Sequence, residues 1–147
     1  MKKRRRAREL CLQGLYALEI SKNPVDQVIE DVRQKETDEE ILSFACQLLR
    51  ATAEQNEALD QEVMSVVKNW DLNRIALVDR LILRMALCEI LNFEEIPPKV
   101  TINEAIDLAK KFSTSESGRF VNGILDSLYQ HYKTTSKLAK KGRGLLE

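Results

Sequence analysis

The sequence of 147 residues has few of the residue types from which catalytic and metal sites are built. It has one histidine, His131, which argues against histidine-dependent catalytic triads and multi-histidine metal sites. Three cysteines, Cys11, Cys46 and Cys88, are isolated, so we expect reduced thiols packed in the core. There is no G-x-G-x-x-G and no Walker-type phosphate loop. These absences predict a protein without cofactor, metal or catalysis.

Glycine, proline and long apolar runs are also scarce. Five glycines and three prolines leave little material for an all-β protein rich in turns. No run of 18 apolar residues exists, and residues 9–20 are amphipathic rather than a signal-peptide apolar stretch. We therefore expect a cytoplasmic protein with no membrane partner, and the length fits one domain.

The charges balance in total but not along the chain. The 23 Lys and Arg residues match 23 Asp and Glu residues. Residues 1–8 hold six basic side chains and residues 133–144 hold five, with no acid in either segment, whereas residues 9–132 hold 12 basic and 22 acidic side chains. This sorting offers basic arms to a polyanion and an acidic surface to a basic partner.

Apolar residues recur at helical spacing along most of the chain, and no stretch alternates with period two over a strand's length. Capping-box matches begin at Thr37 and Thr101. The segment 75–91 is apolar nearly all round, which predicts a central helix. We expect an all-α domain over residues 1–133 and a basic, disordered tail over 134–147. Its seven helices are predicted at about 5–20, 25–32, 38–52, 59–70, 75–91, 101–112 and 120–132.

A run of cations opens the first predicted helix. Cations at a helix N-terminus oppose the helix dipole, so helix stability does not explain them. A phosphate-bearing ligand would explain these cations, because guanidinium binds phosphate with two hydrogen bonds and each neutralised phosphate releases counterions. A nucleic acid is therefore the favoured partner, and a solvated N-terminus that aids solubility or weakly contacts lipid is the alternative. The run consists of Lys2, Lys3, Arg4, Arg5, Arg6 and Arg8.

Several other residues have two interpretations. Gly14 and Gly123 lie inside helical patterns, where glycine costs about 0.5–1 kcal/mol relative to alanine, so either another helix or a ligand should approach closely there. Tyr16 and Phe120 could be core aromatics or stacking platforms, with spacing favouring the core, and Trp70 is equally ambiguous.

Four charged residues interrupt the apolar central helix. They could indicate acid-base chemistry, but salt-bridged groups on the polar seam of a buried helix are favoured. They are Asp79, Arg80, Arg84 and Glu89.

Seven short segments, taken together in order and spacing, resemble the bacterial NusB family. Any one of them alone would be a weak signal. The resemblance runs from the arginine run to about Tyr132, and only the acidic stretch 26–62 and the tail lack recognisable motifs. The segments are RRRARE at 4–9, QGLY at 13–16, VDRLILR at 78–84, IPPKV at 96–100, INEA at 102–105, AKKF at 109–112 and FVNGILD at 120–126.

The resemblance implies two packed three-helix sub-bundles preceded by an N-terminal helix. It implies a non-catalytic transcription antitermination factor that binds the boxA RNA of ribosomal RNA leaders together with NusE, a small-subunit ribosomal protein. Other Nus factors and RNA polymerase would join through the antitermination complex. Monomer and homodimer both remain open.

The resemblance also assigns site residues. It makes Phe120 a base-stacking platform and Gly123 a point of close RNA approach. The NusE contact would use or be supported by Tyr16, Asp79 and Glu116. The full RNA-binding set is Arg4, Arg5, Arg6, Arg8, Lys99, Arg119, Phe120, Asn122 and Gly123.

Two other hypotheses are open. A NusB-like domain also precedes the catalytic domain of some ribosomal RNA cytosine methyltransferases, so the chain could be an RNA-binding module of that kind; its length favours the stand-alone factor. Alternatively, it could be a helical adaptor whose arginines contact acidic proteins.

Overall fold

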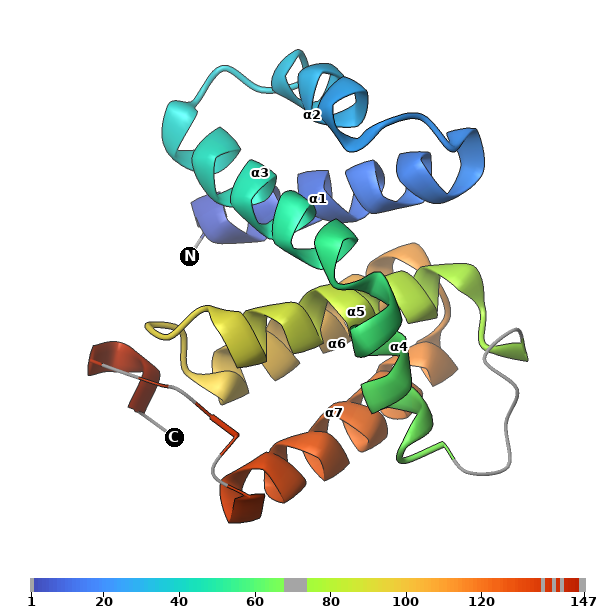
Figure 1. The fold of residues 1–147 in the computed structure, drawn as a ribbon, viewed down its shortest axis with the longest axis vertical. Coiled ribbons are helices and arrows are strands. Elements are labelled where there is room, and N and C mark those ends of the chain that lie inside the picture. The colour runs from blue at the N-terminus through green and yellow to red at the C-terminus, as the bar shows by residue number, and fades with distance from the viewer. Residues whose placement is uncertain (1, 68–73, 136, 139, 141, 146–147) are drawn as a thin grey trace. The chain divides into compact units, whose positions relative to one another are not determined.

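The computed structural model describes residues 2–67, 74–135, 137–138, 140 and 142–145, and within them it contains seven α-helices and no strand (Figure 1). This confirms the all-α prediction. No described helix is long and apolar enough to cross a membrane. The chain divides into two compact units, Met1–Gln55 and Asn56–Glu147. The α-helices are α1 (Lys2–Ser21), α2 (Val25–Arg33), α3 (Glu39–Glu54), α4 (Asn56–Met64), α5 (Leu77–Asn92), α6 (Pro98–Phe112) and α7 (Ser115–Thr135).

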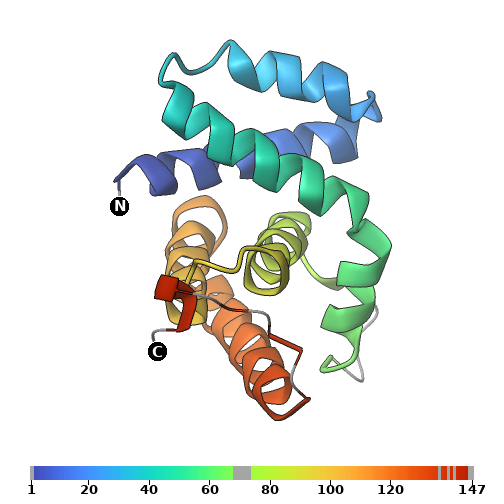
Figure 2. The same ribbon diagram turned by 60° about the vertical axis from the view of Figure 1, so that its left-hand side comes forward.

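The first unit is a three-helix bundle in which α1, α2 and α3 all contact one another (Figures 1 and 2). The first helix is thus part of a bundle rather than an element that precedes it. Gly14 is a point of close approach between α1 and α3, because a Cβ there would lie 2.7 Å from Leu49 Cδ2. The helix-to-helix interpretation of Gly14 is confirmed.

The second unit is built around α5, which contacts α4, α6 and α7, and α6 also packs on α7 (Figure 1). All residues from Leu81 to Ile90 are buried, as the apolar pattern predicts. Charged groups of α5 have partners on other helices. Arg84 donates to both oxygens of Asp60 on α4, at 2.7 and 2.8 Å, and Glu89 accepts from Thr101 Oγ1 on α6 at 2.7 Å.

Helix starts differ from the sequence predictions. The N-cap of α3 is Asp38 and not the predicted Thr37. The Asp38 carboxylate accepts hydrogen bonds from the backbone N–H groups of Glu40 and Ile41. The start of α6 lies three residues before Thr101, because Pro98 fits the first helical turn and lacks only an N–H that would be unpaired there. Residues 115–117, expected in a loop, are helical, and Thr114 Oγ1 accepts from the Ser117 N–H at 3.2 Å.

The segment expected as a solvated tail is partly placed against the second unit. Helix α7 continues to Thr135, and Gly142–Leu145 forms a 3-10 helix. Lys140 Nζ donates to the carbonyl oxygens of Glu89 and Phe93, at 3.3 and 2.9 Å, at the C-terminal end of α5. A cation stabilises this end of a helix through the exposed carbonyls.

Four further expectations concern single residues. Cys11, Cys46 and Cys88 are reduced and buried, which confirms packed core thiols, and burial raises the pKa of the Cys46 thiol. Trp70 lies outside the described residues.

Candidate functional site

The basic cluster, which we define as Lys2, Lys3, Arg4, Arg5, Arg6 and Arg8, occupies the first two turns of α1. The side chains of residues 2–5 are exposed. Arg8 is only 3% exposed, which makes it far less accessible to a ligand than its neighbours. The guanidinium carbons of Arg4 and Arg8 lie 4.0 and 5.5 Å from the ring centroid of Phe44, a buried residue of α3. Cation-π attraction to this ring therefore positions the cluster on α3.

Carboxylates from the start of α3 and the loop before it neutralise part of the cluster. Lys3 Nζ lies 2.7 Å from Glu40 Oε2 and 3.2 Å from Asp38 Oδ2, and these two carboxylates, Glu40 foremost, raise the pKa of Lys3. Arg6 Nε donates to Glu36 Oε1 at 3.4 Å. A hydrogen bond from the Asp38 backbone N–H is the main cause that lowers the pKa of Glu36. These carboxylates therefore compete with an external anion for the cations of the cluster.

A second group of predicted residues surrounds a hollow of about 280 Å³ at the start of α7. Phe120 is half-buried at this hollow, and Glu116 is exposed on the same helix. Asp79 contributes from α5. The structure thus brings together Asp79 and Glu116, expected at a protein contact, and Phe120, expected at RNA. Other lining residues are Arg74, Ile75 and Ser117.

Asp79 is buried with one of its oxygens unsatisfied. Its Oδ2 accepts from Ser117 Oγ at 2.9 Å, and the residue is 6% exposed. Its Oδ1 is buried without a hydrogen-bond partner. Leaving such an atom without a donor costs about 1–3 kcal/mol.

Further along α7, Arg119, Asn122 and Gly123 are exposed. A Cβ at Gly123 would meet nothing within 4 Å, so the helix-packing interpretation of this glycine is wrong and the surface there is open. A ligand could therefore approach the backbone of α7 at Gly123 and the ring of Phe120 on the same helix.

Lys99 does not join this group. Helices α6 and α7 are antiparallel, because Gly118 lies against Lys110 while Pro98 lines a hollow with Tyr129 and Lys133. Lys99 is thus near the opposite end of α7, about 15 Å from Phe120 at 1.5 Å per helical residue.

Tyr16, predicted at the protein contact, lies on α1 with 47% of its surface exposed, so it is not a core aromatic. Sequence reasoning missed Ser117, whose role depends on Asp79, 38 residues earlier in the chain. Nor did it find Glu36 and Glu40 as partners of the basic cluster, although both lie in the acidic stretch whose charge was evident.

The comparisons with known proteins agree with the fold and the motifs. The NusB family model matches residues 5–130. The transcription antitermination protein NusB of Chloroherpeton thalassium is 39% identical over 146 residues, which cover 98% of this chain and 69% of that protein. The structure of T. maritima NusB aligns with this chain with a TM-score of 0.83 and 34% sequence identity. The alignment covers 91% of this chain and 95% of the T. maritima chain.

A chain in the crystal structure of the antitermination factors NusB and NusE in complex with dsRNA has a TM-score of 0.81 at 23% identity, covering 90% of this chain and 99% of its own. This likeness shows the shared fold. The expected lack of catalysis agrees with the family, which is non-catalytic. On the family match over residues 5–130 and the identity to curated relatives, the chain belongs to the NusB family of transcription antitermination proteins.

Proposed function

We propose that this protein binds the boxA RNA of ribosomal RNA leader transcripts together with NusE and so promotes processive transcription of ribosomal RNA operons. The observation that carries the proposal is the basic cluster, exposed over residues 2–5, whose positive charge opposes the dipole of the helix it opens. A solved relative of the same fold is described as a complex of NusB and NusE with dsRNA, which supports both ligands. Other Nus factors and RNA polymerase would join through this complex.

On the RNA side, Arg4, Arg5 and Arg6 would bind phosphates, because they present donors at an exposed helix end. Arg8, being buried, would act by holding the cluster against Phe44. On α7, Phe120 would stack on a base. Arg119, Asn122 and Gly123 would line the path of the backbone beside it, and Lys99 would contact a more distant nucleotide.

On the protein side, Asp79 and Glu116 would receive donors from NusE. Ribosomal proteins are basic, and charge complementarity speeds and orients association. The unsatisfied Oδ1 of Asp79 would accept a hydrogen bond from the partner, and Glu116 would supply an exposed negative charge at the same hollow. Tyr16 would add an exposed aromatic contact on the first unit.

The test is a titration of labelled boxA RNA with this protein, alone and with NusE. Affinity should rise when NusE is added, because a second surface on the same RNA acts at a high effective concentration. An RNA affinity that NusE leaves unchanged would contradict the joint surface. A protein that binds NusE but no RNA would instead favour the adaptor hypothesis.

Phe120→Ala tests the stacking role. Loss of a stacked base should weaken boxA binding by about 1–3 kcal/mol while the helical content stays unchanged. Phe112→Ala is the matched control, because Phe112 is a phenylalanine of the second unit that is 39% exposed, but it lies on α6 and does not line the hollow. Equal effects of the two variants would remove Phe120 from the RNA site.

A further inference from the structure

A second hollow, of about 440 Å³, lies on the first unit beside the basic cluster. It is lined by residues of two helices that are far apart in sequence. Lys3 and Arg4 come from α1, and Glu40, Ser43, Phe44 and Gln47 come from α3. The α3 residues carry none of the motifs that indicate function in the sequence.

Arg4 is held in a defined position at this hollow. Its guanidinium carbon lies 4.0 Å from the centroid of the Phe44 ring, which is only 6% exposed. A guanidinium that stacks on a ring through one face keeps its N–H groups available at its edges. The side chain of Arg4 is exposed, so these donors can reach a phosphate.

Ser43 and Gln47 give the hollow neutral hydrogen-bonding groups. They are four residues apart and therefore lie on the same face of α3, and both are exposed. A hydroxyl and a carboxamide can each donate and accept hydrogen bonds, as recognition of a ribose 2′-hydroxyl or a base edge requires.

Glu40 lies at the same hollow and occupies Lys3. The 2.7 Å contact between its Oε2 and Lys3 Nζ places a carboxylate where a phosphate oxygen would bind this ammonium. Its side chain is 72% exposed, so the pair is one that a phosphate can displace. Binding at this hollow would therefore replace the Glu40 carboxylate at Lys3 by a phosphate of the ligand.

We propose that this hollow is a nucleotide subsite for RNA, in which Lys3 and Arg4 bind a phosphate that displaces Glu40, while Ser43 and Gln47 bind the sugar or base. The proposal rests on the RNA-binding function proposed above and extends its surface from α1 onto α3. Glu40 sets the affinity of the subsite, because RNA must compete with it for Lys3.

Four variants of the full chain test the subsite, with boxA RNA in the presence of NusE as the probe. Gln47→Ala should weaken binding about fivefold through lost hydrogen bonds. Glu40→Gln should strengthen it about two- to fivefold, because Lys3 loses its shorter ion pair and keeps only the one with Asp38 at 3.2 Å. The two effects have opposite signs, so general damage to the fold cannot produce both.

Each variant has a control on the same helix. Arg50→Ala removes a cation three residues from Gln47, but Arg50 does not line the hollow and is paired with Asp26 of α2 at 2.7 Å. Glu39→Gln removes a similarly exposed acid from the same helical turn as Glu40, but Glu39 pairs with Arg33, at 3.9 Å, which lies outside the basic cluster. Both controls should change the affinity less than twofold.

The subsite is supported if Gln47→Ala weakens binding more than Arg50→Ala does and Glu40→Gln strengthens it more than Glu39→Gln does. Failure of either comparison, in a wild-type protein that binds boxA RNA, overturns the subsite and leaves the proposed function intact. A wild-type protein that binds no boxA RNA overturns the proposed function and the subsite together.

Discussion

At the scale of single residues, two glycines with the same sequence signal have opposite environments. Both Gly14 and Gly123 interrupt helical patterns, yet a Cβ at Gly14 would lie 2.7 Å from Leu49 and 3.3 Å from Val32, whereas a Cβ at Gly123 would meet nothing. The sequence shows that a reason is needed at each position. The identity of the neighbour depends on tertiary packing, which a single helical pattern does not contain.

This difference predicts opposite effects of alanine on stability. Gly14→Ala should lower the free energy of unfolding by about 1 kcal/mol, because overpacking against the buried Leu49 exceeds the gain in helix propensity. Gly123→Ala should raise it by about 0.5–1 kcal/mol, since helix propensity acts alone. Urea denaturation of both variants measures this. Destabilisation by Gly123→Ala would show that the position is packed.

At the scale of elements, the sequence predicts the existence of each helix better than its ends. The apolar patterns of α3 and α7 are long enough to identify a buried face, and α5 is recognised because it is apolar nearly all round. The ends depend on which polar group happens to reach a free backbone N–H. Thr37 and Asp38 are both good N-cap residues, and the structure uses Asp38. Capping boxes alone therefore place a helix start only within a few residues.

Helix α4 is fixed to α5 by the bidentate pair of Asp60 and Arg84. The Arg84 side chain is 7% exposed, and its charge is expensive to leave without Asp60. We expect Asp60→Ala to destabilise the protein by about 2–3 kcal/mol, and Arg84→Met, which replaces the buried charge by an apolar chain, to cost less. Denaturant titrations give both values. A larger cost for Arg84→Met would indicate that the other contacts of Arg84 dominate.

Lys140 makes the contact between the C-terminal segment and the end of α5 dependent on pH. Burial lowers the pKa of Lys140 to about 8, although the carboxylates of Glu89 and Glu94 partly oppose this. Between this value and the ordinary lysine pKa of about 10.4, the unfolded chain binds more protons than the folded one. The cost of burying the Lys140 ammonium is therefore relieved as the pH rises from about 8 toward 10, and the free energy of unfolding increases.

The measurement is the melting temperature of the wild type and of Lys140→Met between pH 7.5 and 9.5. The wild type should gain stability relative to the variant across this range. Comparison with a variant is necessary because the raised pKa of Cys46 acts in the opposite direction, and equally in both proteins. Parallel curves would show that Lys140 is solvated like an ordinary lysine.

At the scale of the whole molecule, the balanced total charge conceals separate surfaces. The sorting of cations to the ends and acids to the body could be read from the sequence. The pairing of Lys3 and Arg6 with Glu36, Asp38 and Glu40 could not, because it depends on the packing of α1 against α3. The basic cluster is consequently a partly neutralised surface, and its apparent charge toward RNA is smaller than its composition indicates.

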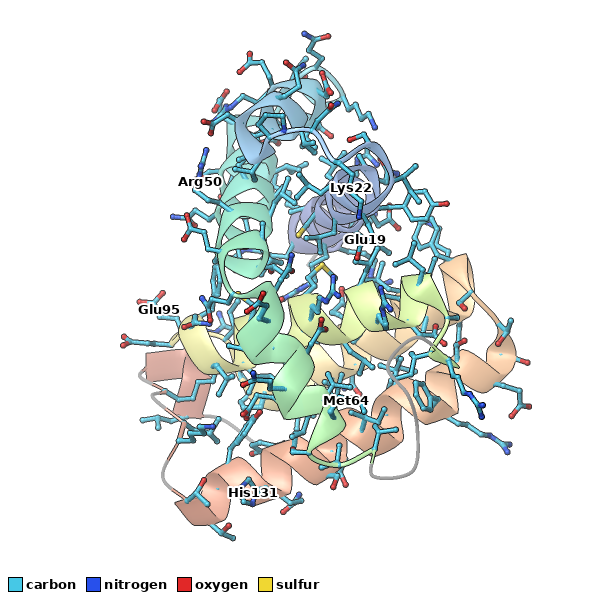
Figure 3. All side chains as sticks on the ribbon, turned by 45° about the vertical axis from the view of Figure 1, so that its right-hand side comes forward. Glu19, Lys22, Arg50, Met64, Glu95 and His131 are labelled. Carbon is cyan, nitrogen blue, oxygen red and sulfur yellow. The ribbon has the colours of Figure 1, made fainter. Side chains whose placement is uncertain are left out.

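The final prediction concerns the salt dependence of RNA binding, which counts the phosphates that the cluster neutralises. For single-stranded RNA the slope of log K against log salt is about −0.7 per phosphate contact, so replacing Arg4, Arg5 and Arg6 by alanine should flatten it by up to about 2. Anisotropy titrations between about 50 and 200 mM salt measure the slope. The control removes three cations of the same unit that lie outside the basic cluster, each of them in a surface ion pair. It should leave the slope nearly unchanged. Equal flattening by both triple variants would mean that RNA responds to total charge and not to this helix end. The control replaces Lys22, Arg33 and Arg50, of which Lys22 and Arg50 are labelled in Figure 3.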